Sequence, residues 1–289
     1  MTNTTTSTNT TNESRFFDLT NISEGYVNRI RLVKPAKGKP FYACTLRSGD
    51  LSVDVIAVST KAVKALELIK PHFDKNAVIK AKWIASDLSI SDFTYDKDVG
   101  EHQKGDKGFM AKGRLLDLVN VSVNGSAFEE LPVNDTRKLG TFGFGYINDI
   151  RSFRTNAMSC SIAALHGEYN KDLGIKAETT RISCDIDTTL VSNMQHLQKI
   201  SSKETAVIAR FEVSNLKKFD FTYTKDVGVN KAGDKGAKFI GALTAISAVF
   251  LDGVRTPLLT ETLASSEADD NEQNTNQVEE NETQLAQAE

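Results

Sequence analysis

Cysteine, proline and tryptophan are scarce in this chain, which contains three, five and one of them in 289 residues. The cysteines, Cys44, Cys160 and Cys184, are odd in number and form no C-x-x-C pair, so we expect neither a disulfide framework nor a structural zinc site. Cys44 and Cys160 occupy matching positions of an apolar strand, which is typical of a buried thiol. Unpaired thiols favour a reducing compartment, and we expect a cytoplasmic protein of a bacterial cell.

Long apolar runs and the common catalytic motifs are missing as well. No stretch of about 18 apolar residues is present, so the sequence predicts no membrane span. Residues 1–14 are mainly Thr, Asn and Ser, lack the features of a signal peptide and are expected to be disordered. There is no Walker-type phosphate loop, no G-x-S-x-G, no H-E-x-x-H and no Cys–His pair at a useful spacing. We therefore expect neither an enzyme nor a bound cofactor or metal.

Basic residues are absent from the end of the chain. From Glu261 onward there are nine acidic residues and no Lys or Arg. The rest of the chain therefore contains 29 of the 38 acidic residues and all 35 basic ones. The net charge of −3 therefore hides a mildly basic body and an acidic tail, residues 257–289. This layout is typical of proteins whose body binds nucleic acid and whose disordered tail recruits partners, here replication or recombination proteins. A merely solubilising tail is the alternative.

One segment of the chain occurs twice. The octapeptide of residues 93–100, Phe-Thr-Tyr-Asp-Lys-Asp-Val-Gly, returns at residues 221–228 with a single change, at an offset of 128. Upstream, Gly-Tyr-Val-Asn-Arg-Ile-Arg of residues 25–31 returns as Gly-Tyr-Ile-Asn-Asp-Ile-Arg at residues 145–151, at an offset of 120. We infer two copies of one domain, residues 15–125 and 142–256, joined by a hinged linker, residues 126–141.

The two copies share one order of expected elements. Alternating apolar and polar residues predict strands, and a 3.6-residue period predicts one helix in each copy. The expected elements of the first copy are strands 26–33, 41–46 and 51–58, a helix that Ser59 caps, and strands 77–84 and 109–123. Those of the second are strands 144–153, 158–165 and 179–186, helix 188–200, and strands 206–213 and 238–251. A helix between the third and fourth of five strands indicates a mainly β oligonucleotide/oligosaccharide-binding (OB) barrel, with a small β-sandwich as the second choice. Residues 16–19 look like a docking segment.

The candidate binding residues combine aromatic rings with basic side chains. Phe93, Tyr95 and Lys97 alternate along one strand face, and Phe221, Tyr223 and Lys225 repeat them. Bases of a single strand stack on flat rings while cations neutralise its phosphates, although ordinary cross-strand packing would give the same pattern. In the fourth strands, Lys82 and Arg210 share an outward register. The further candidates are Arg31, Lys34, Lys37, Lys39, Tyr42, Lys107, Arg151 and Lys235. The basic turn around Lys37 predicts stronger binding by the first copy.

Two resemblances follow from these residues. A barrel of this order with a polar, acidic tail resembles bacterial single-stranded DNA-binding protein. The string of residues 25–31, followed by Val33-Lys34-Pro35, resembles the opening motif of the replication proteins of integrative and conjugative elements. The next segment of that family, Cys-x-Ile-Ala-Ala-Leu-His-Gly, is matched by residues 160–167. The resemblance implies a role in maintaining the DNA of a mobile element or phage.

These observations favour a largely sequence-independent single-stranded DNA-binding protein, although RNA would satisfy the same pattern. Two chains would supply four barrels, so a homo-oligomer is a further expectation. A non-catalytic interaction module of a replication or conjugation complex is the main alternative. A metal-dependent nuclease is a weaker one, because it would need carboxylates that converge from different strands.

Overall fold

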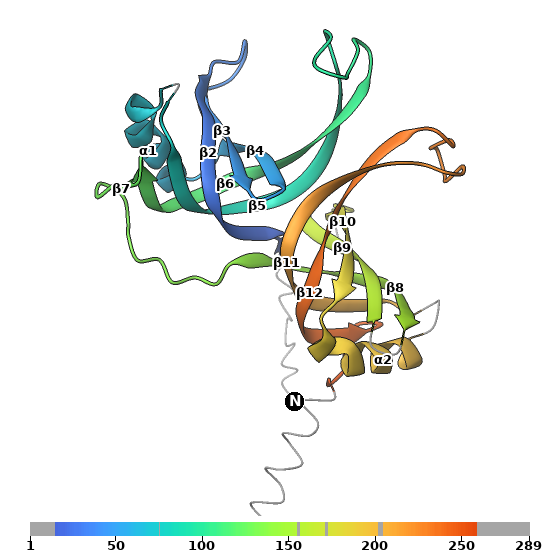
Figure 1. Ribbon diagram of the computed structural model, residues 1–289. Helices are drawn as coiled ribbons and strands as arrows, with labels where there is room; N and C mark the ends of the chain where they lie inside the picture. The colour runs from blue at the N-terminus through green and yellow to red at the C-terminus, as the bar shows by residue number, and fades with distance from the viewer. Residues whose placement is uncertain (1–14, 75, 155–156, 171–172, 202–204, 259–289) are drawn as a thin grey trace, which may run out of the picture.

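The computed structural model describes residues 15–74, 76–154, 157–170, 173–201 and 205–258 (Figure 1). They form two five-stranded barrels in tandem, each with one α-helix. The first barrel consists of β2 (Thr20–Val33), β3 (Phe41–Ser48), β4 (Leu51–Ala57), α1 (Thr60–Ile69), the 3₁₀ turn η1 (Lys70–His72), β5 (Ile79–Thr94) and β6 (Lys107–Val123). The second consists of β8 (Gly140–Arg154), β9 (Ala157–Tyr169), β10 (Glu178–Ile186), η2 (Thr188–Leu190), α2 (Val191–Ile200), β11 (Val207–Thr222) and β12 (Lys235–Leu251). The short strands are β1 (Arg15–Phe17), β7 (Ser126–Ala127) and β13 (Val254–Arg255).

Each barrel closes in the same way. In the first, β2 pairs with both β3 and β5, and β4 pairs with β6 in parallel. In the second, β8 pairs with both β9 and β11, and β10 pairs with β12 in parallel. This ring, with its helix between the third and fourth strands, confirms the predicted OB barrel. Most observed strands extend past the predicted ones at one end or both, whereas β4 ends one residue earlier than predicted, at Ala57. Strand β5 begins at Ile79 and continues without a break to Thr94.

The long strands bend at equivalent bulges. Asp87 in β5 and Asn215 in β11 both have a φ of 51°, and each lies at a shift of register against the next strand. Asn120 in β6 and Ala248 in β12 are a second pair, with φ of 51° and 47°. A bulge inserts an extra residue and sharpens the local twist, which allows one strand to turn a barrel corner. The four bulges therefore shape both barrels alike.

The interiors are apolar and contain the residues that the alternation assigns to them. Trp83 and Phe211, which occupy equivalent positions in β5 and β11, are both buried. Helix α1 begins after Ser59, whose hydroxyl accepts a hydrogen bond from the Ala62 amide at 3.0 Å, as expected for an N-cap. All three cysteines are free and buried, and burial raises the pKa of the Cys44 thiol to about 12. Among the described residues, no helix has both the length and the apolar composition needed to cross a membrane.

The two barrels share one sheet, because β2 pairs antiparallel with β8. The register joins Thr20 to Phe142, Asn21 to Thr141 and Ile22 to Gly140. At the repeat offset of 120, Thr141 is the equivalent of Asn21, so this residue pairs with its own counterpart. The Asn21 amide donates to the Thr141 hydroxyl at 2.9 Å, and both side chains are buried. A segment that pairs antiparallel with its own copy defines a local two-fold axis, as in an isologous dimer interface. The chain thus resembles a homodimer joined into one polypeptide.

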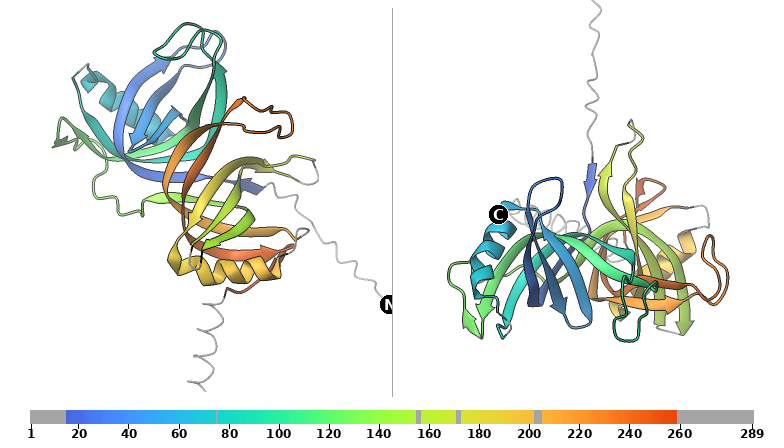
Figure 2. Two further views of the ribbon diagram at one scale, coloured as in Figure 1. Left: turned by 45° about the vertical axis from the view of Figure 1, so that its right-hand side comes forward. Right: turned by 90° about the horizontal axis from the view of Figure 1, so that it is seen from above.

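Further contacts cross this joint. Leu19 is fully buried against the second barrel, where the Cβ of any residue replacing Gly143 would lie 3.1 Å from a Leu19 methyl carbon. The Thr180 hydroxyl of β10 donates to the Leu88 carbonyl of β5 at 3.0 Å. Strand β1 pairs with β9, which agrees with the interpretation of residues 16–19 as a docking segment. The two helices lie at opposite ends of the molecule, far from this joint (Figures 1 and 2).

The segment between β7 and β8, residues 128–139, is bound to the first barrel and is not the hinge that the sequence predicts. We call this segment the strap. The side chain of Leu131 is buried, and the Pro132 carbonyl accepts a hydrogen bond from the Asn120 amide at 2.8 Å. The Lys82 ammonium lies 2.9 Å from the Asp135 carboxylate and also donates to the backbone carbonyls of Asp135 and Arg137. The segment therefore follows the outer face of the first barrel until it enters β8 (Figure 2). These contacts fix the strap on that barrel.

Lys82→Met should loosen the strap without disturbing the barrel interior. The variant keeps an apolar stem but removes hydrogen bonds from a charged donor, so the free energy of unfolding should fall by about 1–2 kcal/mol. Two hydrogen bonds hold the pKa of the Asp135 carboxyl well below its usual range: the one from the Arg137 side chain has the larger effect, and the one from Lys82 adds to it. This interaction therefore stabilises the fold above the unfolded pKa of about 3.9 and is lost as the pH falls toward the lower folded value. The unfolded pKa of Asp135 is common to variant and parent, and Arg137 keeps the folded carboxyl ionised in both, so their difference in urea unfolding should be the same at pH 7 and at about pH 4. It should narrow only as the pH approaches the folded pKa, and a difference already lost at about pH 4 would contradict this account.

Candidate nucleic-acid interface

Two hairpin arms project from the barrels, and the repeated octapeptide forms part of their tips. We define the first arm as residues 89–112 of β5, β6 and their loop, and the second as residues 217–240 of β11, β12 and their loop. In the first tip, the Tyr95 amide donates to the Asp106 carbonyl at 2.9 Å, and the Gly105 amide donates to the Tyr95 carbonyl at 2.8 Å. Tyr223 makes the same two bonds in the second tip, at the same distances. The repeat therefore encodes one loop structure twice.

The acidic residues of this repeat cap their own loops. The Asp98 carboxylate accepts from the Lys104 amide at 2.8 Å, and the Asp226 carboxylate accepts from the Ala232 amide at 2.9 Å. The hydrogen bond from the Ala232 amide lowers the pKa of Asp226 most, and one from the Lys231 side chain lowers it further. Within the described parts of the chain, no group of three His, Cys, Asp or Glu side chains could hold a metal ion. These two carboxylates of the repeated loops thus bind backbone amides of their own loops.

The paired aromatics of each arm lie against a glycine of the neighbouring strand. The rings of Phe93 and Tyr95 have centroids 4.9 Å apart, and those of Phe221 and Tyr223 are 5.1 Å apart. A Cβ on Gly108 would lie 2.5 Å from the Phe93 ring, so only glycine allows the ring to rest on β6. All four rings are half-buried. Each pair is therefore both a packing element and a partly exposed flat surface.

The second barrel has a groove of about 1220 Å³ on the outer face of its sheet. Strands β8, β9, β10, β11 and β12 line it, and Phe221 and Tyr223 of the second arm form part of its wall. Phe153, which is 67% exposed, lines it near the end of β8. The outer face of these strands and the adjoining loops are the region with which OB barrels bind oligonucleotides.

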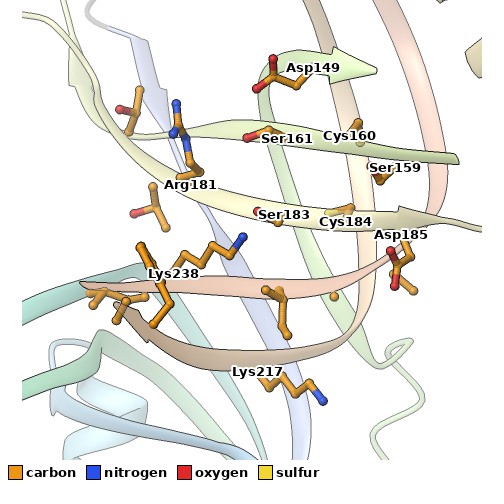
Figure 3. A pocket seen from close by; sticks show the side chains of 18 of the residues that line it. Asp149, Ser159, Cys160, Ser161, Arg181, Ser183, Cys184, Asp185, Lys217 and Lys238 are labelled. Carbon is orange, nitrogen blue, oxygen red and sulfur yellow. The ribbon is translucent and has the colours of Figure 1, made fainter. Parts of the chain in front are cut away.

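Basic side chains from four strands enter this groove, and three of them are visible in Figure 3. Arg151 lies 3.5 Å from Asp149, and Lys217 lies 3.9 Å from Asp50. Arg181 and Lys238 form no ion pair with any carboxylate of the described residues, and the Lys238 ammonium lies 5.9 Å from the Phe221 ring centroid. Two unpaired cations thus lie in the same groove as an aromatic pair. Three carboxylates also line it: Asp149, Glu178 and Asp185.

The first barrel has an equivalent groove of about 810 Å³, formed by β2, β3, β4, β5 and β6. Arg31, Lys112 and Phe41 line it, and Arg114 joins them while paired with Asp87 at 3.0 Å. The aromatic pair of the first arm is not among its lining residues, unlike that of the second arm. The second groove is therefore larger and has more exposed rings. From the sequence, by contrast, stronger binding by the first copy is expected because of the basic turn around Lys37.

The two grooves meet at the joint between the barrels. Ser89, His166 and Glu178 line both of them. His166 is 5% exposed, and its Nε2 lies 3.0 Å from the Thr180 hydroxyl. That hydroxyl donates its proton to the Leu88 carbonyl, so Nε2 carries the hydrogen of this contact and His166 cannot act there as a base toward Thr180. The contact therefore holds the joint in place.

The structure places three of the predicted contact residues outside the grooves. Lys82 does point outward from its strand, but the strap covers it, and its side chain is only 4% exposed, so it is unavailable to a phosphate. Arg210, at the equivalent position, is exposed but is not part of the groove lining. Tyr42 packs against the hydrophobic core, with the Lys70 ammonium 5.6 Å from its ring centroid. These three residues lie outside both grooves.

The other predicted residues fall into three groups. Arg31 lines the first groove, and Arg151, Phe221 and Tyr223 line the second. The exposed basic residues of the loop between β2 and β3 are Lys34, Lys37 and Lys39. The residues of the arms outside the groove linings are Phe93, Tyr95, Lys97, Lys107, Lys225 and Lys235. Of these, Lys107 pairs with Asp92 at 3.1 Å.

Sequence reasoning missed three basic residues of the second groove. Arg181 follows the alternation of β10, in which Thr180 and Ile182 are buried and Arg181 is exposed, so the two-residue period could have identified it. Lys238 alternates in the same way with the buried Phe239 of β12. Lys217 follows the bulge at Asn215, where the alternation changes phase, and no local pattern would have placed it.

Comparison with known proteins gives a family but no activity. One family model, described as "Protein of unknown function (DUF3577)", matches residues 10–136 and again residues 132–258. No curated protein matches the chain. The two matches correspond to the two barrels, and the first includes most of the strap. The chain therefore belongs to the DUF3577 family and contains its unit twice, as a tandem duplication.

Proposed function

We propose that the chain binds single-stranded DNA with little sequence preference and acts in the replication or maintenance of a mobile element or phage. One observation carries the binding proposal. In the second groove, the half-exposed Phe221 and Tyr223 lie together with Arg181 and Lys238, whose charges are unpaired among the described residues. Rings on which bases stack and cations that neutralise phosphates are the two requirements of a sequence-tolerant single-strand site.

The position of the groove and the sequence resemblance support the remainder of the proposal. The groove lies on the face that OB barrels use for oligonucleotides. The acidic residues after Glu261, which lie outside the described residues, would recruit replication or recombination proteins. The resemblance of residues 25–31 and 160–167 to replication proteins of integrative and conjugative elements supports the biological setting. Catalysis forms no part of this proposal.

Fluorescence anisotropy with a labelled oligo-dT of about 30 residues tests the binding. We expect log K to fall linearly with log salt, at a slope of about −2 to −3 if three or four groove cations neutralise phosphates of a single strand. Duplex DNA should compete poorly, because its bases cannot stack on the rings, and labelled oligo-U compares RNA with DNA. Absence of binding at about 50 mM salt would contradict the proposal.

A protein-interaction module is the second candidate, and the charge of the first groove favours it. That groove contains three basic residues, Arg31, Lys112 and Arg114, and three acidic ones, Asp54, Asp87 and Glu178. A balanced surface of this kind suits a protein partner with mixed charges better than a phosphate backbone. The same titration separates the two candidates, because an interaction module would leave the anisotropy of oligo-dT unchanged.

A further inference from the structure

The two-fold relation between the barrels constrains the direction of any strand that occupies both grooves. Asn21 pairs with its own repeat counterpart, Thr141, in the antiparallel junction of β2 and β8. A second pair of contacts obeys the same symmetry. Strand β5 touches β10 at the hydrogen bond from Thr180 to Leu88. Likewise β11, the counterpart of β5, contacts β4, the counterpart of β10, and Lys217 lies 3.9 Å from Asp50 in the turn just before β4. One local axis therefore relates the two barrels and their grooves.

A nucleic-acid strand has chemically different 5′ and 3′ directions, whereas a two-fold axis presents the same surface in opposite orientations. Arg31 and Arg151, which are equivalent at the repeat offset of 120, line the first and the second groove. If these equivalent residues bind the strand, the strand must run in the same direction relative to each barrel. The two bound segments then run in opposite directions where the grooves meet, at Ser89, His166 and Glu178. A strand of ordinary polarity cannot pass straight from one groove into the other and satisfy both.

We propose that the preferred ligand is a pair of single-stranded segments of opposite direction, such as the two arms of one strand that doubles back between the grooves. This inference rests on the proposed function and adds the topology of the substrate to it. A long strand would loop between the grooves, and two short strands would each occupy one groove. The preference for segments of opposite direction follows from the two-fold relation of the barrels, because barrels related by translation alone would bind one continuous strand.

Oligo-dT with an inverted centre tests the proposal directly. The probes are three labelled dT oligomers of about 16 residues, within the range that two OB barrels can hold. One has uniform polarity, one contains a central 3′–3′ linkage and one a central 5′–5′ linkage. In one of the inverted oligomers both halves fit their grooves without a loop, so it should bind at least about 10-fold more tightly than the uniform oligomer, because the second half binds at a high effective concentration. A uniform oligomer of about 40 residues should recover this gain, since it is long enough to double back.

A groove variant shows whether both sites are used. Arg181→Glu reverses a charge in the second groove only, so the inverted oligomer should lose its advantage and bind about as tightly as the uniform one. Arg210→Glu makes the same change of net charge outside both grooves and should leave the advantage intact. Equal affinities of the three short oligomers for the unmodified chain would overturn the opposed arrangement while leaving single-strand binding in place. Failure of every oligomer to bind would overturn the proposed function, and this inference with it.

Discussion

Replacing Gly25 with alanine is expected to destabilise the first barrel severely. A Cβ built at this position would lie 2.0 Å from the Arg47 carbonyl oxygen and 3.0 Å from the Arg47 carbonyl carbon. Both atoms belong to the backbone of β3, so no change of rotamer relieves the overlap. Tyr26, the next residue, pairs in register with Arg47, and the substitution would therefore separate the two strands that begin the barrel.

Gly145 occupies the same position in the second barrel, where a Cβ would lie 2.5 Å from the Ala163 carbonyl oxygen. Each glycine-to-alanine variant should lose about 4 kcal/mol or more of unfolding free energy, the range reached when a backbone must move. The matched control is Ser23→Ala, two residues before Gly25 on β2, which should change stability by less than about 0.5 kcal/mol. Urea unfolding followed by circular dichroism measures all three. A loss below about 1 kcal/mol in either glycine variant would show that the strands can separate at little cost.

These glycines illustrate what the sequence can predict. Gly25 and Gly145 open the repeated heptapeptide, and the alternation on either side of them locates β2 and β8. The same kind of alternation assigns Trp83 and Phe211 to the interior, and both are buried. Strand period, cap residues and turn residues are local properties, which is why the five strands, the helix and their order can be derived. The duplication supports each assignment a second time.

The joint and the strap cannot be derived in this way. Alternation correctly places Lys82 on the outer face of β5, but it gives no information about which distant segment covers that face. The strap residue Asp135 lies 53 positions away along the chain and meets Lys82 only after the fold has formed. The pairing of Asn21 with Thr141 likewise depends on a long-range contact between two segments that local pattern treats as separate strands. Such long-range contacts determine whether a side chain is accessible to a ligand, and the local sequence pattern does not contain this information.

The candidate site is predicted only in part for the same reason. The repeat identifies both aromatic pairs, yet only Phe221 and Tyr223 line a groove, whereas Phe93 and Tyr95 do not. The difference lies in the environments of two nearly identical arms, not in the rings themselves. In the first arm His102 stacks on Tyr95, with ring centroids 4.6 Å apart. The second arm has Asn230 at the equivalent position, whose amide donates to the Tyr223 hydroxyl at 3.2 Å and leaves the ring face without that partner.

Removing one ring and reversing one charge in the second groove is expected to cause the largest loss of single-strand affinity. Tyr223→Ala removes a stacking surface, which is worth about 1–3 kcal/mol per base, or roughly 5- to 150-fold in affinity. Lys238→Glu reverses a cation that forms no ion pair among the described residues, so it should also reduce the magnitude of the salt slope by about one. The double variant should therefore bind oligo-dT at least about 100-fold more weakly. Tyr223→Phe keeps the ring and should retain most of the affinity.

Two matched variants separate this site from general effects of charge or of arm structure. Arg210→Glu alters the net charge as Lys238→Glu does, but Arg210 lies outside both grooves, so its affinity should stay within about 3-fold of the parent at moderate salt. Tyr95→Ala removes the equivalent ring of the first arm, which does not line a groove, and should likewise have a small effect. If Arg210→Glu weakened binding as strongly as Lys238→Glu, affinity would depend on overall charge rather than on a built site. If Tyr95→Ala matched Tyr223→Ala, the arms themselves would be the binding surface, and the grooves would lose their assigned role.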